Sequence, residues 1–355
     1  MSLSAHAEEL ISTASALATS GKGILAADES TNTIGKRFAD IQIENNEGNR
    51  QAYRGMLFTT AGLGDFISGA ILFEETLFQS HADGEPMVQK LKTLGIIPGI
   101  KVDQGLRPLP GAQSIETVCT GLDGLVERAS KYYAKGARFA KWRSVLQITP
   151  GGCPSPLAVR ECAWGLARYA RSVQESGLVP IIEPEILMDG DHSIDVTASV
   201  QENVLKEVYH ACQLNGVLLE GTLLKPSMTI QGADCPERTE PSTVAKLTIR
   251  TLERCVPASV PGIVFLSGGL SEEMASVYLN CMNQIPRKAS WNLGFSYGRA
   301  LQHSCLKAWA GTEQEAGQAA LLARARANSE ASEGRYIPGS QPSSDEQLFV
   351  AGYTY

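Results

Sequence analysis

Eight short apolar runs recur along the chain, each bounded by glycine, proline or polar residues. They lie at 23–30, 66–75, 95–103, 137–143, 178–185, 216–226, 262–269 and 291–299. Runs of this length that are apolar throughout are typical of strands buried on both faces, as in a parallel sheet. Their starts are spaced at roughly 30 to 45 residues, which leaves room for a helix between most neighbours.

Helix-like segments occupy several of the intervals between these runs. Residues 121–136 carry apolar side chains at helical spacing and end in Gly136. Residues 155–177 and 199–216 show the same pattern. Residues 271–285 begin with a serine and two glutamates, which favour the N-terminus of a helix.

The alternation of strand and helix predicts an α/β fold, a (β/α)8 TIM barrel built as a single domain from residues 1–355. A doubly wound open sheet is the alternative that the pattern leaves open. The segment 310–355 has a different character. Residues 318–332 indicate a C-terminal helix, and residues 333–355 indicate a mobile tail, a flexible arm rich in Gly, Ser and Pro.

The composition bears on partners and location. Hydrophobic residues at 43% and charged residues at 19% are typical of a soluble globular protein, and the net charge of -7 argues against nucleic acid as a partner. We find no apolar run long enough for a membrane span and no secretory signal at the start. We therefore expect a cytoplasmic protein, with the plastid stroma as the alternative if a transit peptide has been removed.

The cysteines and histidines are scattered, with no CxxC pair and no HExxH motif. This pattern indicates reduced thiols and predicts neither a metal nor a cofactor. A metal held by residues far apart in the sequence remains the alternative.

Charged side chains gather where the predicted strands end. The stretch GVLLEGTLLKPSM, residues 216–228, reads as a buried strand that ends on Lys225, although an unpaired buried ammonium is costly. Other strand ends carry Asp28, Glu29, Lys101, Asp103, Lys141, Arg143, Glu183, Glu185 and Arg299. Active sites of barrels lie at the carboxyl ends of the strands, so these groups would share one small volume. Paired structural charges could explain any one of them, but chemistry and a charged ligand explain the set better.

A lysine in such a place allows amine chemistry. Its ordinary pKa of about 10.4 is lowered by nearby cations or by burial, which frees the lone pair. The amine can then attack a ketone and form a Schiff base, and the iminium withdraws electrons so that a neighbouring C–C bond can break. Adjacent carboxylates would supply the acid and the base.

The loops after the last two predicted strands suit a phosphate. Phosphate in barrels is commonly held by the loops after strands seven and eight, which here contain Ser267, Gly268 and Gly269, then Ser296, Gly298 and Arg299. Glycines permit close backbone approach to phosphate oxygens, and an arginine adds a bidentate donor.

With these residues in view, the chain resembles class I fructose-1,6-bisphosphate aldolase, the metal-independent Schiff-base type. The matching stretches span essentially the whole chain: GKGILAADEST, GARFAKWR, LVPIIEPEIL, LLEGTLLKPSM, VFLSGG, FSYGRALQ and the terminal tyrosine. The resemblance implies reversible aldol cleavage of fructose 1,6-bisphosphate to dihydroxyacetone phosphate and glyceraldehyde 3-phosphate, in glycolysis, gluconeogenesis or the Calvin cycle. It also implies a homotetramer and cytoskeletal binding.

The resemblance assigns catalytic roles as well. It implies that Lys225 forms the Schiff base, that Lys141 lowers its pKa, and that Glu183 helps to dehydrate the carbinolamine. It implies further that Asp28 takes the hydroxyl proton during C–C cleavage and that Glu185 tunes the lysine pair. The last residue, Tyr355, would move a proton at the enamine carbon.

The resemblance also assigns the two phosphates of the substrate. The groups that would hold the C1 phosphate are Ser267, Gly268, Ser296, Gly298 and Arg299, with Arg37 nearby. The groups that would serve the C6 phosphate are Ser30, Thr33, Lys101 and Arg143. The chain departs from many relatives at Asn32 and Thr33, where they have glycine and serine, but Thr33 keeps a hydroxyl. A Schiff-base barrel for unphosphorylated sugars and a non-enzymatic interaction protein are the competing functions, and a preference between fructose and sedoheptulose bisphosphates is left open.

Overall fold

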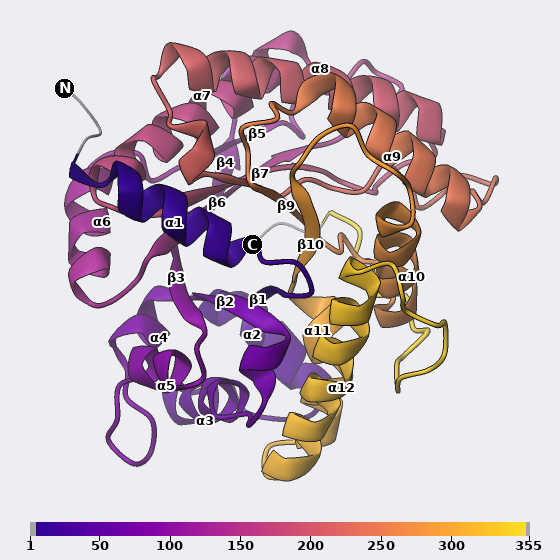
Figure 1. The fold of residues 1–355 in the computed structure, drawn as a ribbon. Coiled ribbons are helices and arrows are strands. Elements are labelled where there is room, and N and C mark those ends of the chain that lie inside the picture. The colour runs from indigo at the N-terminus through magenta and orange to yellow at the C-terminus, as the bar shows by residue number, and fades with distance from the viewer. Residues whose placement is uncertain (1–4, 353–355) are drawn as a thin grey trace.

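A closed barrel of eight parallel strands forms the centre of the computed structural model, which describes residues 5–352 (Figure 1). The strands are β1 (Gly23–Ala27), β2 (Ile67–Leu72), β3 (Ile97–Lys101), β6 (Phe139–Leu146), β7 (Val179–Ile186), β8 (Leu223–Leu224), β9 (Gly262–Phe265) and β10 (Asn292–Tyr297). Each overlaps one of the predicted apolar runs. Pairing of β1 with β10 closes the sheet, so the predicted (β/α)8 barrel is confirmed and the open sheet is wrong.

The helices lie around the barrel, except for α1, which lies across one of its ends (Figure 1). They are α1 (Ala7–Leu17), α2 (Thr31–Asp40), α3 (Glu47–Phe58), α4 (Glu74–Phe78), α5 (Met87–Thr93), α6 (Leu125–Ala134), α7 (Pro156–Glu175), α8 (Ile194–Leu214), α9 (Pro241–Cys255), α10 (Glu272–Asn283), α11 (Arg299–Trp309) and α12 (Gln314–Ser332). Two 3-10 turns, η2 (Leu63–Asp65) and η3 (Leu219–Gly221), and an antiparallel pair, β4 (Leu106–Pro108) with β5 (Thr117–Cys119), complete the elements. Within residues 5–352, none of these helices combines the length and the apolar character that crossing a membrane requires.

Serine caps fix where three helices begin, two of them at the first residue of a predicted segment, whereas α8 begins at Ile194, five residues before the predicted start at 199. The side chains of Ser155, Ser193 and Ser271 accept hydrogen bonds from backbone N–H groups in the first turns of α7, α8 and α10. Such caps satisfy donors that the helix itself leaves unpaired. The three starts place the helices behind β6, β7 and β9, as the alternation predicts.

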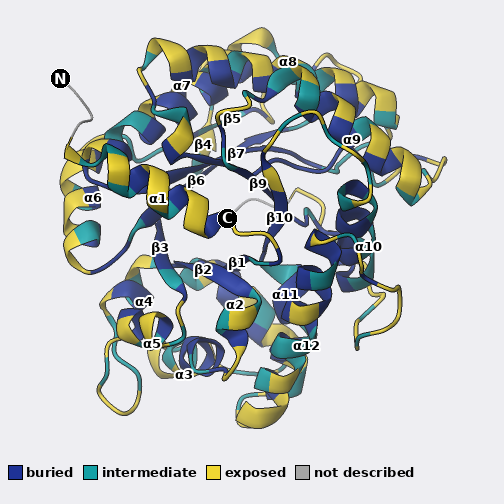
Figure 2. Ribbon diagram, in the orientation of Figure 1, coloured by how far each residue is buried: buried dark blue, intermediate teal, exposed yellow. Residues whose placement is uncertain are grey.

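The core has two layers, and buried residues occupy the strands and the inward faces of the helices (Figure 2). The inner layer fills the barrel end opposite the strands' carboxyl ends, where Leu10, Ala14 and Leu17 of α1 pack beside Phe139. A Cβ atom on Gly99 would lie only 2.3 Å from the Phe139 ring, which explains the glycine in the middle of β3. Helix α1 therefore plugs one end and leaves the other as the functional end.

The run 216–226 is a strand only at Leu223 and Leu224, so the prediction of a continuous strand is wrong. The side chain of Gln174 on α7 replaces the missing sheet partners. Its amide donates to the carbonyls of Leu218 (2.8 Å) and Gly221 (3.1 Å) and accepts from the Leu218 N–H (3.0 Å). These bonds satisfy the backbone of a tight turn, after which the chain rejoins the barrel directly before Lys225.

The described part of the predicted arm, residues 333–352, has no helix or strand and runs back to the barrel mouth. The Leu348 N–H donates to the Gly269 carbonyl (3.0 Å), and its own carbonyl accepts from Arg299. The Gly352 N–H donates to Asp189 (2.6 Å). The arm thus contacts the loops that follow β7 and β9 and the first residue of α11, and its mobility stays a prediction.

Candidate active site

Two lysines and two carboxylates meet in the mouth of the barrel. Glu183 on β7 bridges the lysines, with its carboxylate oxygens 3.2 Å from Lys225 Nζ and 3.3 Å from Lys141 Nζ. Lys141, on β6, also donates a hydrogen bond of 3.0 Å to Asp28, the residue that directly follows β1. All four residues are buried, although the chain separates Asp28 from Lys225 by most of the barrel. The predicted catalytic cluster therefore exists as a cluster in space.

The mutual charges set the protonation of this cluster. Burial lowers the pKa of Lys225 below its ordinary value, and the Lys141 charge lowers it further, against the opposing effect of Glu183. Burial on its own would raise the pKa of Asp28, but the Lys141 and Lys225 charges outweigh it and lower that pKa to about 2. Asp28 is thus a carboxylate at neutral pH, while the Lys225 amine loses its proton more readily than a lysine in water.

Glu185 lies one step further out along β7 and pairs with Arg143 of β6. Arg143 Nε lies 2.5 Å from Glu185 Oε2. Burial would raise the pKa of Glu185, but the Arg143 guanidinium beside it lowers that pKa overall. Alternate residues of β6 and β7 point to the same side, which brings both charged pairs to the barrel interior as predicted.

A pocket next to Lys225 collects the predicted groups for the first phosphate. Its lining includes Arg37, Ser267, Gly268, Ser296, Gly298 and Arg299. Gly298 caps α11, so the first backbone N–H groups of that helix are at the pocket. Ser296 is buried, and its hydroxyl has no hydrogen-bond partner within residues 5–352. Orphaned buried hydroxyls are uncommon, and this one fits an anionic ligand.

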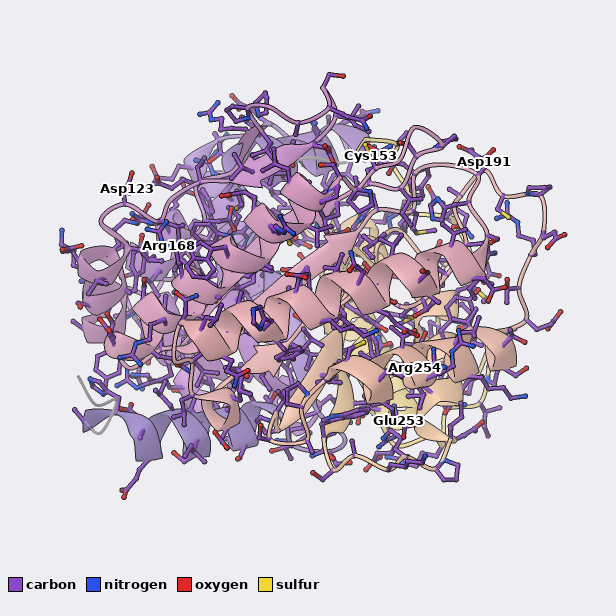
Figure 3. The ribbon with its side chains drawn as sticks, turned by 90° about the horizontal axis from the view of Figure 1, so that it is seen from above. Asp123, Cys153, Arg168, Asp191, Glu253 and Arg254 are labelled. Atoms are coloured by element: carbon purple, nitrogen blue, oxygen red, sulfur yellow. The ribbon has the colours of Figure 1, made fainter. Side chains whose placement is uncertain are left out.

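The site lies at the carboxyl ends of the strands, at the end of the barrel opposite α1. In Figure 3 the loops after β6 and β7, marked by Cys153 and Asp191, lie in the upper part of the view, while α1 lies at the lower edge. The active-site end of the barrel therefore faces away from the end that α1 closes.

Known proteins match both the sequence and this geometry. The sequence profile described as fructose-bisphosphate aldolase class-I matches residues 9–355. The chain belongs to this family. The predicted family and enzyme class are thereby confirmed.

Individual aldolases show how close the match is. Fructose-bisphosphate aldolase 3, chloroplastic, of Arabidopsis thaliana is 54% identical over 99% of this chain and 89% of its own length. The cytoplasmic isozyme of Spinacia oleracea is also 54% identical, over 99% of this chain and 98% of its own. A solved structure of the Plasmodium falciparum aldolase, in complex with TRAP and a small molecule inhibitor, shares 56% identity with a TM-score of 0.93. That match covers 94% of this chain and 97% of the other.

The groups that the aldolase resemblance assigns to the second phosphate are less closely gathered. Thr33 and Arg143 line the same pocket as Lys225. Ser30 caps α2, and its hydroxyl lies 3.0 Å from that of Thr33. Lys101, at the end of β3, is buried and pairs with Asp103 at 2.7 Å. Tyr355 lies outside the described residues.

Sequence reasoning missed two polar residues of this aldolase that contact Glu29 beside the pocket, and it gave Glu29 itself no role. Glu29 follows Asp28 and lines the pocket, while Arg54 of α3 and Gln302 of α11 both donate to its carboxylate. Arg54 and Gln302 sit within ordinary amphipathic helices, so no local pattern distinguishes them.

Proposed function

We propose that this aldolase cleaves fructose 1,6-bisphosphate reversibly through a Schiff base on Lys225. The observation that carries the proposal is the buried contact of Lys225 with Glu183, which Lys141 shares from the other side. A lysine whose pKa is lowered by burial and by a second lysine is a nucleophile, and a carboxylate between the two amines can pass protons to either.

The first half of the reaction forms the iminium. The Lys225 amine attacks the C2 ketone and gives a carbinolamine. Glu183, in its protonated form, gives a proton to the departing hydroxyl, which leaves as water. The nitrogen lone pair forms the C=N bond, so the positive charge ends on the iminium, beside the Asp28 carboxylate. Lys141 is within reach to return a proton to Glu183.

The second half breaks the C3–C4 bond. Asp28 takes the proton of the C4 hydroxyl, the bond electrons move to the iminium, and glyceraldehyde 3-phosphate leaves with an enamine remaining on Lys225. Protonation of the enamine at C3, assigned to Tyr355, restores the iminium. Water then hydrolyses it, which releases dihydroxyacetone phosphate and the free amine.

The two phosphates fix the substrate across this cluster. Ser267, Gly268, Ser296, Gly298 and Arg299 would hold the C1 phosphate, because they line the pocket beside Lys225. Ser30, Thr33, Lys101 and Arg143 would serve the C6 phosphate. A Schiff-base barrel for unphosphorylated sugars would need neither the orphaned Ser296 hydroxyl nor the arginines in this pocket, so the phosphorylated substrate is favoured.

Arg299→Ala should raise the KM for fructose 1,6-bisphosphate by at least about tenfold, because a charge-assisted pair with phosphate is lost. Steady-state kinetics measures this change. Arg326→Ala is the matched control, since that arginine lies on α12 with an exposed side chain and does not line the pocket. A KM for Arg299→Ala within threefold of wild type would remove Arg299 from the phosphate site.

Deleting Tyr355 alone should slow proton exchange at the enamine carbon, measured as loss of tritium from labelled dihydroxyacetone phosphate. We expect a drop of at least about tenfold, as for other general acids and bases. Borohydride trapping on Lys225 should persist, since the arm contacts at Leu348 and Gly352 precede the deletion. Unchanged proton exchange would show that Tyr355 has no role in moving the proton. Loss of trapping would show that the arm is needed to form the active site.

Other expectations remain predictions. They are a single barrel domain with residues 310–355 as C-terminal helix and mobile tail, a homotetramer, cytoskeletal binding, a cytoplasmic location with the plastid stroma as alternative, and independence of metals and cofactors. The relatives include both cytosolic and chloroplastic isozymes. The Plasmodium falciparum aldolase was solved in complex with TRAP, so a protein partner has a precedent in that relative.

A further inference from the structure

Glu29 is a buried carboxylate on the pocket wall for which the proposed reaction has no use. One of its carboxylate oxygens, Oε1, accepts from Arg37 Nη1 and from Gln302 Nε2 at 3.0 Å. The other oxygen, Oε2, accepts from Arg54 Nη2 at 3.0 Å. The carboxylate is therefore bonded on both sides and cannot rotate without breaking a charge-assisted hydrogen bond.

Arg54 is the deepest member of this group. Its side chain is 1% exposed, and its guanidinium donates to the Thr76 hydroxyl at 2.8 Å and to the Glu29 carbonyl at 3.0 Å. Thr76 lies on α4 and is fully buried. The backbone and the carboxylate of Glu29 are thus both bound to a guanidinium that is itself held in place.

Arg37 is the arginine of this group whose side chain lines the pocket. Its side chain is 18% exposed, it lines the pocket, and its Nη2 atom would lie 4.0 Å from a Cβ atom on Gly298. Arg54 is not among the pocket-lining residues. The chain of contacts thus leads from the buried Arg54, through Glu29, to Arg37 beside the start of α11.

We propose that Glu29 is a positioning residue that holds Arg37 at the phosphate pocket, with Arg54 and Thr76 as its buried support. The inference rests on the proposed function, because it takes the pocket ligand to be the C1 phosphate. Ion pairs between the buried Glu29 carboxylate and two arginines, one buried and one partly exposed, contribute little net stability, since desolvation offsets the attraction. Orientation of a ligand-binding guanidinium is a use that justifies the arrangement, because substrate binding and rate depend on such fixed geometry.

Glu29→Gln tests the proposal through the split between KM and kcat. The amide keeps the shape but loses the charge that orients Arg37, so the KM for fructose 1,6-bisphosphate should rise about tenfold while kcat changes less than about threefold. If Glu29 merely weakened the Arg37 charge, the KM would fall instead, which would overturn the proposal. Glu202→Gln is the matched control, because Glu202 forms a similar ion pair with Arg254 (2.7 Å) away from the pocket lining and from the Arg54 group.

A double-mutant cycle separates positioning from structure. In an Arg37→Ala background, Glu29→Gln should change the KM less than about twofold, because its effect passes through Arg37. An equal effect in both backgrounds would mean that Glu29 acts by supporting the fold, and the proposal would be wrong.

A milder change covers the case in which Glu29→Gln leaves Arg54 unpaired and the protein unfolded. Thr76→Val removes only the hydroxyl that accepts from Arg54, and it should raise the KM about threefold through the same chain of contacts. An unchanged KM in a folded Thr76→Val enzyme would contradict the role of Arg54 and Thr76. Borohydride trapping on Lys225 at saturating substrate should survive in all these variants, so its loss would count against the proposed function and not against the positioning role.

Discussion

Lys225→Met is expected to abolish cleavage of fructose 1,6-bisphosphate, with a loss of at least about a thousandfold, as for other covalent nucleophiles. Methionine is nearly as long as lysine but has no amine, so neither carbinolamine nor iminium can form. The barrel should stay folded, because Lys225 is buried and an apolar side chain avoids the cost of burying an ammonium. Glu183 would keep its contact with Lys141.

Kinetics and circular dichroism would check this pair of outcomes. Lys206→Met is the control, since Lys206 lies on α8 with a 58% exposed side chain and takes no part in the mouth. Residual borohydride trapping in Lys225→Met, mapped to Lys141 or Lys101, would move the Schiff base to another lysine.

Glu183→Gln should lower kcat by roughly a hundredfold to a thousandfold, because the carbinolamine loses the acid that protonates its departing hydroxyl. The amide still offers an oxygen to Lys225 and Lys141, which should preserve the positions of both amines. Single-turnover experiments should therefore show slow formation of the borohydride-sensitive species, with substrate binding little changed.

Glu202→Gln is the matched control for this variant. Glu202 also sits between two cations, Lys206 and Arg254, but on the outside of the molecule. A kcat for Glu183→Gln within about threefold of wild type would show that another group protonates the carbinolamine.

Much of the fold follows from the sequence because parallel strands are buried on both faces. That requirement produces apolar runs in the sequence, and these runs overlap the observed strands from Gly23–Ala27 to Asn292–Tyr297. The failure at 216–226 has a physical cause in tertiary structure. Its backbone is satisfied by the side chain of Gln174, which is distant in sequence, and no local pattern carries that information.

The site residues also divide into those that a local sequence pattern predicts and those that only tertiary contacts reveal. Residues at strand ends could be predicted to meet, because all strands of the barrel point the same way, and Asp28, Lys141, Glu183 and Lys225 do meet. The group around Glu29 could not be predicted, because Arg54 and Gln302 reach it from helices that only the folded barrel brings together.

The central claim is that Lys225 carries the covalent intermediate. The most direct test is to reduce the full-length wild-type protein with borohydride in the presence of dihydroxyacetone phosphate. The modified lysine is then located by peptide mass mapping after digestion. The proposed mechanism predicts one irreversible adduct, on the peptide that contains Lys225 and nowhere else. Reduction that leaves every lysine unmodified, or an adduct confined to Lys141, would contradict it.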